Sequence, residues 1–173
     1  SRSRMTPAIY SEGTGSDGSG GGIYMGLDAQ VHNSTEEREE KYSNQQPAAL
    51  AFYSDFSLWD IFRTQMPWLL LTDEPTALGI LRSLGEMTTQ QGGFPKWTTA
   101  SVDKHVMVGV PGASMALEAS FIPGMTEQFD VAAMQAALQQ QATDPNFGVN
   151  GRADVEFYLK NGYVSEEEVE KAS

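Results

Sequence analysis

Four side chains that could bind a ligand lie in the segment 52–97. They are two tryptophans, one aspartate and one arginine: Trp59, Asp60, Arg63 and Trp97. They stand beside long apolar runs, and a charge on an apolar surface is expensive unless it has a partner or a function. Two interpretations therefore compete: the four residues form part of a ligand pocket, or they stabilise the start of a helix.

Asp60 supports both interpretations. It follows Ser57 by three residues, which is the spacing of a capping box, so its carboxylate could accept hydrogen bonds in the first turn of a helix. Arg63 comes three residues later and would share a helix face with Asp60, so the two could form an ion pair. Such a pair is either structural or a polar clamp for a ligand.

The two tryptophans differ in their predicted setting. Trp59 recurs at helical spacing with Phe56, Phe62 and Met66, which is more typical of a core residue than of a binding platform. Trp97 follows the loop sequence GGFPK, and aromatic residues on loops more often face a ligand. Its ring would suit stacking on the face of a sugar.

Other chemistries find little support in the sequence. Asp55 and Asp60 are five residues apart and would point to different sides of a helix, so they do not form the carboxylate pair that glycoside hydrolysis uses. His32 and His105 have no partner at metal-ligand spacing, which disfavours zinc. The sequence also has no phosphate-binding loop, no serine elbow and no cysteine.

Composition narrows the classes of partner. The 173 residues suffice for one domain and are 40% hydrophobic, which is enough for a core. Eleven basic and 23 acidic residues give a net charge of −12, which argues against a nucleic acid or an anionic membrane surface as partner. No apolar run approaches the length of a membrane span, so we expect no membrane anchor within this segment.

The pattern along the chain predicts a helical array behind a short extended, β-hairpin-like segment near the N-terminus. Residues 23–32 alternate like a strand with a bend at Gly26 and Asp28, after a Gly/Ser-rich surface loop at 11–22. Asn33 begins a glycosylation sequon. Helices are expected from Ser54 or Ser57 to an end or kink at Pro67, from 73 to 92, from about 112 to 121, after Asp130, from 151 or 152 to 162, and after Ser165, with a polar loop at 98–103.

These helices follow no fixed repeat, so a solenoid of the tetratricopeptide type is disfavoured. Irregular loops of varied length between successive helices fit a helical toroid better, with the loops carrying the site.

A series of motifs resembles one known family. YMGLDAQVHN, YSDFSLWDIFRTQMPWLLL, GGFPKW, MVG, GMTEQFDVAAMQAAL and GRADVEFYLKNGYV together resemble the catalytic domain of glycoside hydrolase family 92, the exo-acting α-mannosidases. The resemblance covers nearly the whole chain, and the combination of FSLWD-x-(F/Y)-R with G-x-P-x-W is its most specific part.

The resemblance implies a mainly α fold that is part of an (α/α)6 toroid, preceded by a β-sandwich domain. It implies calcium-dependent, inverting removal of terminal α-linked mannose from a glycan. Asp60 would bind the mannose in the terminal subsite, Trp59 and Arg63 would shape that wall, and Trp97 would lie on a neighbouring loop. The family's general acid, general base and Ca²⁺ ligands belong to later segments, so no catalytic or metal-binding residue is expected in this chain.

Three positions depart from the family pattern. Val110-Pro111-Gly112 stands where polar residues are usual, which puts any substrate contact from that loop in doubt. Pro123 replaces a commonly basic residue, and Ser165 stands where proline is usual.

We therefore expect residues 1–173 to be a partial catalytic domain, truncated at both ends and inactive alone. Its partners would be a mannose-containing glycan and the remainder of its own chain, in a secreted, extracellular or periplasmic protein. The alternative is a non-catalytic helical binding or scaffold module, in which the tryptophans are core residues and Asp60 is a helix cap.

Overall fold

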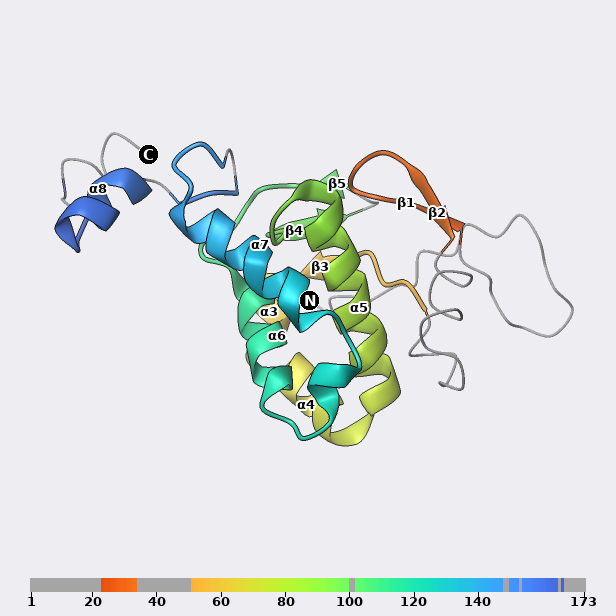
Figure 1. The fold of residues 1–173 in the computed structure, drawn as a ribbon. Coiled ribbons are helices and arrows are strands. Elements are labelled where there is room, and N and C mark those ends of the chain that lie inside the picture. The colour runs from red at the N-terminus through yellow and green to blue at the C-terminus, as the bar shows by residue number, and fades with distance from the viewer. Residues whose placement is uncertain are drawn as a thin grey trace, which may run out of the picture.

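The protein is mainly helical, with two small antiparallel sheets at one end of the helices (Figure 1). The computed structural model describes residues 23–33, 51–99, 102–147, 150–152, 154–164 and 166. Its helices are α3 (Leu58–Ile61), α4 (Gln65–Thr72), α5 (Glu74–Gln91), α6 (Pro111–Ser120), α7 (Val131–Thr143) and α8 (Val155–Asn161), with a 3-10 turn η1 (Met125–Glu127) before α7.

The longest of these helices, α5, lies at the centre of the bundle and has a complete set of start and stop signals. Asp73 caps its first turn by accepting a hydrogen bond from the backbone N–H of Thr76, and Pro75 occupies a position that needs no N–H. Gly92 ends the helix at a φ of 79°, where a residue with a Cβ would be strained. The helix predicted from 73 to 92 is therefore confirmed.

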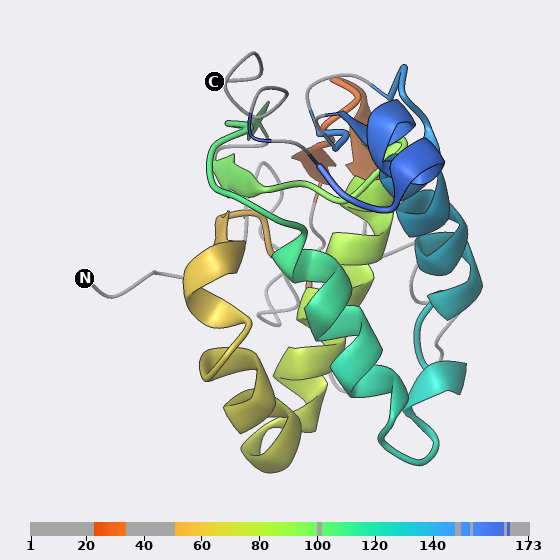
Figure 2. The same cartoon turned by 90° about the vertical axis from the view of Figure 1, so that its left-hand side faces the viewer.

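Helices α4, α6 and α7 pack around α5 (Figure 2). Apolar residues at three- and four-residue spacing form one side of α5, and this side faces the core. Helix α6 approaches α5 closely because Gly112 has no side chain. A Cβ at Gly112 would lie 3.0 Å from a ring carbon of Phe94 and 3.3 Å from Leu84. The fully buried side chains of this core include Leu58, Ile61, Met66, Ile80, Leu81, Leu84, Met87, Phe94 and Met115.

The sequence predicted that the helix would end or kink at Pro67, but the break between the two helices lies before this residue. Helix α3 ends at Ile61, the chain turns over residues 62–64, and α4 begins at Gln65, so Pro67 lies in the first turn of α4. A proline ring clashes with the carbonyl four residues earlier, which here is Arg63, and the first turn of a helix does not need the missing N–H. The interruption predicted at Pro67 therefore falls just before it.

The remaining helix predictions agree with the structure except at their edges. Asp130 caps α7 by accepting from the N–H of Ala133, and α6 ends before Pro123. Helix α8 begins at Val155, later than the predicted 151 or 152. The Gly/Ser-rich loop at 11–22 and the helix after Ser165, apart from Glu166, lie outside the described residues, as does the rest of the sequon that begins at Asn33.

The predicted strand at 23–32 is a hairpin of β1 (Ile23–Met25) and β2 (Val31–Asn33), with the bend between them. Tyr24 is buried: it stacks on Phe52, with ring centroids 3.5 Å apart, and on His32 at 5.3 Å. Its hydroxyl donates to Glu86 Oε2 over 2.9 Å and accepts from Gln90 Nε2 over 3.2 Å, so the hairpin is fastened to α5.

Removing that hydroxyl in Tyr24→Phe is expected to lower the free energy of unfolding by about 1 kcal/mol, the usual value of an intramolecular hydrogen bond with half-buried partners. Urea denaturation followed by tryptophan fluorescence measures the change. Tyr158→Phe, which alters a tyrosine that is 51% exposed, is the matched control. Equal stability of Tyr24→Phe and wild type would show that the Tyr24 hydroxyl does not help to hold the hairpin on α5.

The second sheet contradicts the predicted polar loop at 98–103. Strands β3 (Phe56–Ser57), β4 (Trp97–Thr99) and β5 (Val102–Asp103) pair in that order, all antiparallel. Thr98 is buried, and its hydroxyl is satisfied there: it accepts from the N–H of Phe56 and donates to the carbonyl of Ser54. Tertiary pairing with β3, which local sequence does not reveal, makes this polar segment a strand.

Candidate glycan-binding site

The β3–β4 pairing brings the two tryptophan-containing motifs together. Ser57, at the end of β3, lies opposite Trp97 in the register of the two strands. Helix α3 begins at the next residue and carries Trp59 and Asp60. The segments SLWD and GGFPKW, about forty residues apart in sequence, are therefore neighbours in the fold.

Asp60 is exposed, and its place in the helix matches the predicted capping box only in part. Ser57 is the N-cap residue of α3 and Asp60 is the third helical residue, but neither side chain bonds to the backbone N–H groups of the turn. The Ser57 hydroxyl donates to Asp60 Oδ2 instead. One carboxylate oxygen is thus oriented by Ser57, and Asp60 keeps acceptor capacity on its exposed side.

Arg63 does not form the predicted ion pair with Asp60. Among the described residues, the contacts within 4.0 Å between a basic and an acidic side chain are His32–Asp28 and His105–Asp103, which are ion pairs only when the histidine is protonated. The Arg63 guanidinium lies over the Trp59 ring at 5.2 Å and over the Phe62 ring at 4.9 Å, a cation–π arrangement on the exposed side of α3. Trp59 is half-buried, so its ring is neither fully enclosed in the core nor fully accessible to a ligand.

Trp97 is half-buried in β4, and the loop before it is held by a buried carboxylate that sequence reasoning missed. Asp103 Oδ1 accepts from the backbone N–H groups of Trp97 over 3.0 Å and His105 over 3.1 Å. Its Oδ2 accepts from Lys96 N over 3.2 Å and from Asn150 Nδ2 over 2.7 Å. This set of bonds fixes where the Trp97 backbone lies.

Burial and hydrogen bonding have opposite effects on the pKa of the Asp103 carboxyl group. Burial raises the pKa of the carboxyl group, but the hydrogen bonds from Trp97, Asn150, His105 and Lys96 outweigh it and hold the pKa below its usual value. Asp103 is therefore a charged carboxylate at neutral pH, and it acts on the site by positioning other groups.

Asn150 and His105 extend the Asp103 network. Because Asn150 Nδ2 donates to the Asp103 carboxylate, its Oδ1 faces His105 Nδ1, 2.9 Å away, and that nitrogen must carry a proton. Neutral His105 is thus protonated on Nδ1 and leaves Nε2 as an acceptor. His105 also has a φ of 53°, a left-handed conformation that is uncommon for residues other than glycine.

Gln141, which is buried on α7, holds the other end of the GGFPKW loop. Its Oε1 accepts from the N–H of Phe94 over 3.0 Å, and its Nε2 donates to the carbonyls of Phe94 and Asn150 over 3.2 and 2.8 Å. Neither Gln141 nor Asp103 has a sequence signature, because each acts on backbone groups far away along the chain.

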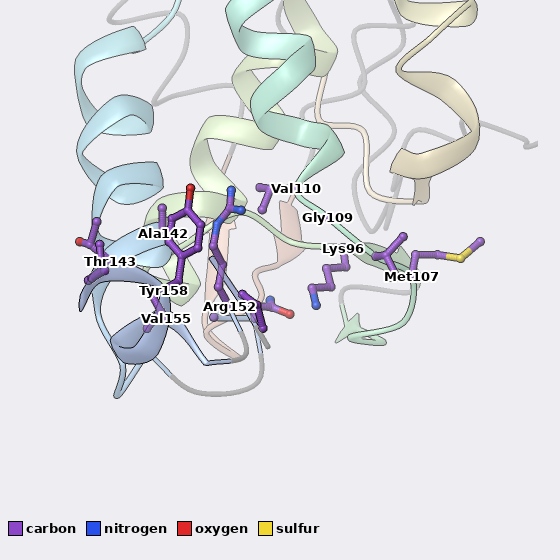
Figure 3. A pocket seen from close by; sticks show the side chains of 14 residues that line it. Lys96, Met107, Gly109, Val110, Ala142, Thr143, Arg152, Val155 and Tyr158 are labelled. Carbon is purple, nitrogen blue, oxygen red and sulfur yellow. The ribbon is translucent and has the colours of Figure 1, made fainter. Parts of the chain in front are cut away.

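A cavity of about 1050 Å³ adjoins this network (Figure 3). It lies between the loop 107–110, the end of α7, the segment 150–152 and α8. Lys96, Asn150 and Arg152 form part of its lining, whereas Trp59, Asp60, Arg63 and Trp97 do not line it. The predicted site residues and this cavity are therefore distinct parts of one loop-bearing end of the protein.

Metal ligands are not assembled in the part of the chain that the structure describes. No three histidines or carboxylates there are grouped so that they could hold an ion. The described residues thus do not fit the calcium that the resemblance implies. None of the described helices is long and apolar enough to cross a bilayer.

The arrangement defines a helical domain with an exposed carboxylate and aromatic residues on adjoining strand and helix ends. Comparison with known families gives the more particular result: the family described as the glycosyl hydrolase family 92 catalytic domain matches residues 2–173. No curated protein matches the chain. The chain belongs to glycosyl hydrolase family 92, a family of glycosidases, and the resemblance found in the sequence is confirmed.

Proposed function

We propose that this chain is part of a calcium-dependent, inverting α-mannosidase that removes terminal mannose from glycans, and that Trp59, Asp60, Arg63 and Trp97 form one wall of its terminal subsite. Membership of a glycosidase family supports the hydrolytic reaction. The observation that carries the assignment of the wall is the pairing of Ser57 with Trp97, which makes the two tryptophan motifs neighbours while Asp60 stays exposed.

The chemistry of the four side chains suits a sugar. The Asp60 carboxylate, with one oxygen oriented by Ser57, can accept hydrogen bonds from sugar hydroxyls. Half-buried tryptophan rings offer an apolar face for the C–H side of a pyranose. Arg63, which is held over Trp59, supplies donors at the edge of the same surface.

Turnover needs groups beyond this wall. In an inverting glycosidase, an acid protonates the leaving oxygen while a base activates a water on the opposite face, with about 6.5–9.5 Å between the two carboxyl groups. We assign neither role to a residue of this chain, and we assign the calcium ligands to other segments of the domain. The 173 residues alone would then bind weakly and hydrolyse nothing.

We also propose that the helices belong to an (α/α)6 toroid in a secreted or periplasmic protein that carries a β-sandwich domain. Large apolar side chains exposed on α4, on α6 and at the C-cap of α6 support packing against further helices, since exposed apolar surface is typical of interaction sites. These residues are Trp68, Leu71, Leu117 and Phe121.

A non-catalytic helical binding or scaffold module is the alternative. The bond between Ser57 and Asp60 favours it to the extent that the aspartate stabilises the helix start. In that case the site would bind no mannose, and the exposed carboxylate would be without function.

Hydrolysis assays on the enzyme that contains this domain separate the two proposals. We expect release of mannose from 4-nitrophenyl α-D-mannopyranoside in preference to the α-glucoside, β-mannose as the first product by proton NMR, and reversible loss of turnover with a calcium chelator. Hydrolysis of the glucoside alone would contradict the specificity. Formation of α-mannose would contradict inversion, and activity that survives the chelator would contradict the calcium requirement.

A further inference from the structure

The cavity beside the Asp103 network has an unusual charge for this protein. Among the lining residues that the structure describes, two are cations, Lys96 and Arg152, and none is an aspartate or a glutamate. The chain as a whole has 23 acidic and eleven basic residues. A basic cavity in so acidic a chain indicates a ligand with negative charge.

Neither cation is neutralised within the described part of the protein. The ion pairs there join His32 to Asp28 and His105 to Asp103, so the Lys96 ammonium and the Arg152 guanidinium take part in none. Figure 3 shows both side chains at the cavity, and they come from separate segments. Unpaired charges that share a cavity repel each other, and an anion between them would relieve that repulsion.

The polar end of the cavity is fixed by the buried network. The backbone N–H of Lys96 donates to Asp103, and Asn150 is held between Asp103 and Gln141. Asn150 precedes Arg152 by two residues, so the backbone of Lys96 and the backbone just before Arg152 are both anchored. A fixed backbone lowers the entropy that is lost when such side chains close on an anion.

The remaining lining is mostly apolar and includes one aromatic ring. Val110 and Val155 form part of this wall, and Tyr158 also lines the cavity (Figure 3). Apolar walls strengthen the attraction between opposite charges by lowering the local dielectric constant. A tyrosine ring with a free edge also suits packing against a sugar.

We propose that this cavity binds a sugar that carries an anionic substituent of the phosphate, sulfate or carboxylate class, held between Lys96 and Arg152. The anion site stands on the cavity itself, whereas the sugar rests on the proposed glycosidase function. The net charge of −12 favours a small anion over a polyanion such as a nucleic acid, because the rest of the surface repels a long negative chain.

Isothermal titration calorimetry on the protein with inorganic sulfate, inorganic phosphate, glucuronate and glucose tests the proposal. We expect the two inorganic anions and glucuronate to bind, glucuronate to bind tighter than sulfate, and glucose to bind at least tenfold more weakly than glucuronate. Lys96→Met and Arg152→Met should each weaken anion binding by about tenfold, which corresponds to one charge-assisted hydrogen bond. Arg152→Lys should retain part of the affinity.

Lys104→Met is the matched control, since it removes the same charge from an exposed residue that does not line the cavity. The proposal is overturned if no anion binds, or if Lys104→Met weakens binding as much as Lys96→Met does. Inorganic anions that bind at Lys96 and Arg152, together with glucuronate no tighter than sulfate, would keep the anion site and reject the sugar. Thermal melts of each variant, compared with the wild type, test whether the substituted protein remains folded.

Discussion

Replacing Asp60 by asparagine is expected to lower kcat/KM for release of terminal mannose by about ten- to a hundredfold. The value corresponds to the loss of a hydrogen bond to a charged group, about 1.5–3 kcal/mol, in the transition state. Asparagine keeps an oxygen that can accept from the Ser57 hydroxyl, so the start of α3 should be preserved. The substitution thus removes charge from the proposed wall with little effect on the helix.

Steady-state kinetics on the enzyme that contains this domain, with 4-nitrophenyl α-D-mannopyranoside, measure the effect. Asp73→Asn is the control because Asp73 is also an exposed aspartate at a helix start, where it accepts from the N–H of Thr76. That variant should retain kcat/KM within about twofold. If Asp60→Asn changed neither turnover nor affinity, Asp60 would be a structural residue and the helical scaffold would become the better interpretation.

The helices could be predicted from sequence because their signals are local. Asp73, Pro75 and Gly92 lie within a few residues of the ends of α5, and Asp130 lies at the start of α7. Capping and φ preference act over one turn, so a linear pattern contains them. The error at Pro67 has the same origin: its steric effect extends four residues back, so the helix breaks before the proline.

The predicted site residues lie in adjoining segments, but the contacts between them could not be predicted. Arg63 was expected beside Asp60 because three-residue spacing places both on one face of a continuous helix. Helix α3 ends at Ile61, so that spacing no longer applies, and Arg63 lies over Trp59 and Phe62 instead. The pairing of β3 with β4, over forty residues, carries no local signature.

Asp103 is the clearest example of a residue whose role could not be predicted from the sequence. It stood in a polar segment that reads as a loop, yet its side chain joins β5 to the backbone of Lys96 and Trp97 and to Asn150. A buried carboxylate is stable only when donors surround it, and those donors come from three separate parts of the chain. Only the folded backbone brings them together.

Asp103→Asn is therefore expected to lower the free energy of unfolding by about 2–4 kcal/mol at neutral pH. The asparagine oxygen can still accept from Trp97 N and His105 N, but its amide nitrogen would then face Asn150 Nδ2, which donates over 2.7 Å in the wild type. Two buried donors in contact leave both unsatisfied. Urea denaturation, with Trp97 among the fluorescent reporters, measures the loss.

The pH dependence of that loss identifies the carboxylate as its cause. The pKa of Asp103 is lowered in the folded protein, so its stabilising effect is fully present above the ordinary value of about 3.9 and disappears as the pH falls through the lower, folded value. The difference between wild type and Asp103→Asn should persist from pH 7 down to about pH 5 and shrink below about pH 4. A difference at pH 3 equal to that at pH 7 would contradict the role of the charge.

Asp144→Asn is the matched control for Asp103→Asn, because Asp144 is half-buried and the nearby Asn146 donates its backbone N–H to the carboxylate over 2.8 Å. It should alter stability by less than about 0.5 kcal/mol. Since Asp103 positions the backbone of both Lys96 and Trp97, the Asp103→Asn variant should also weaken mannose and anion binding together, even though Asp103 contacts neither ligand. Loss of one affinity without the other would mean that the two regions are positioned independently.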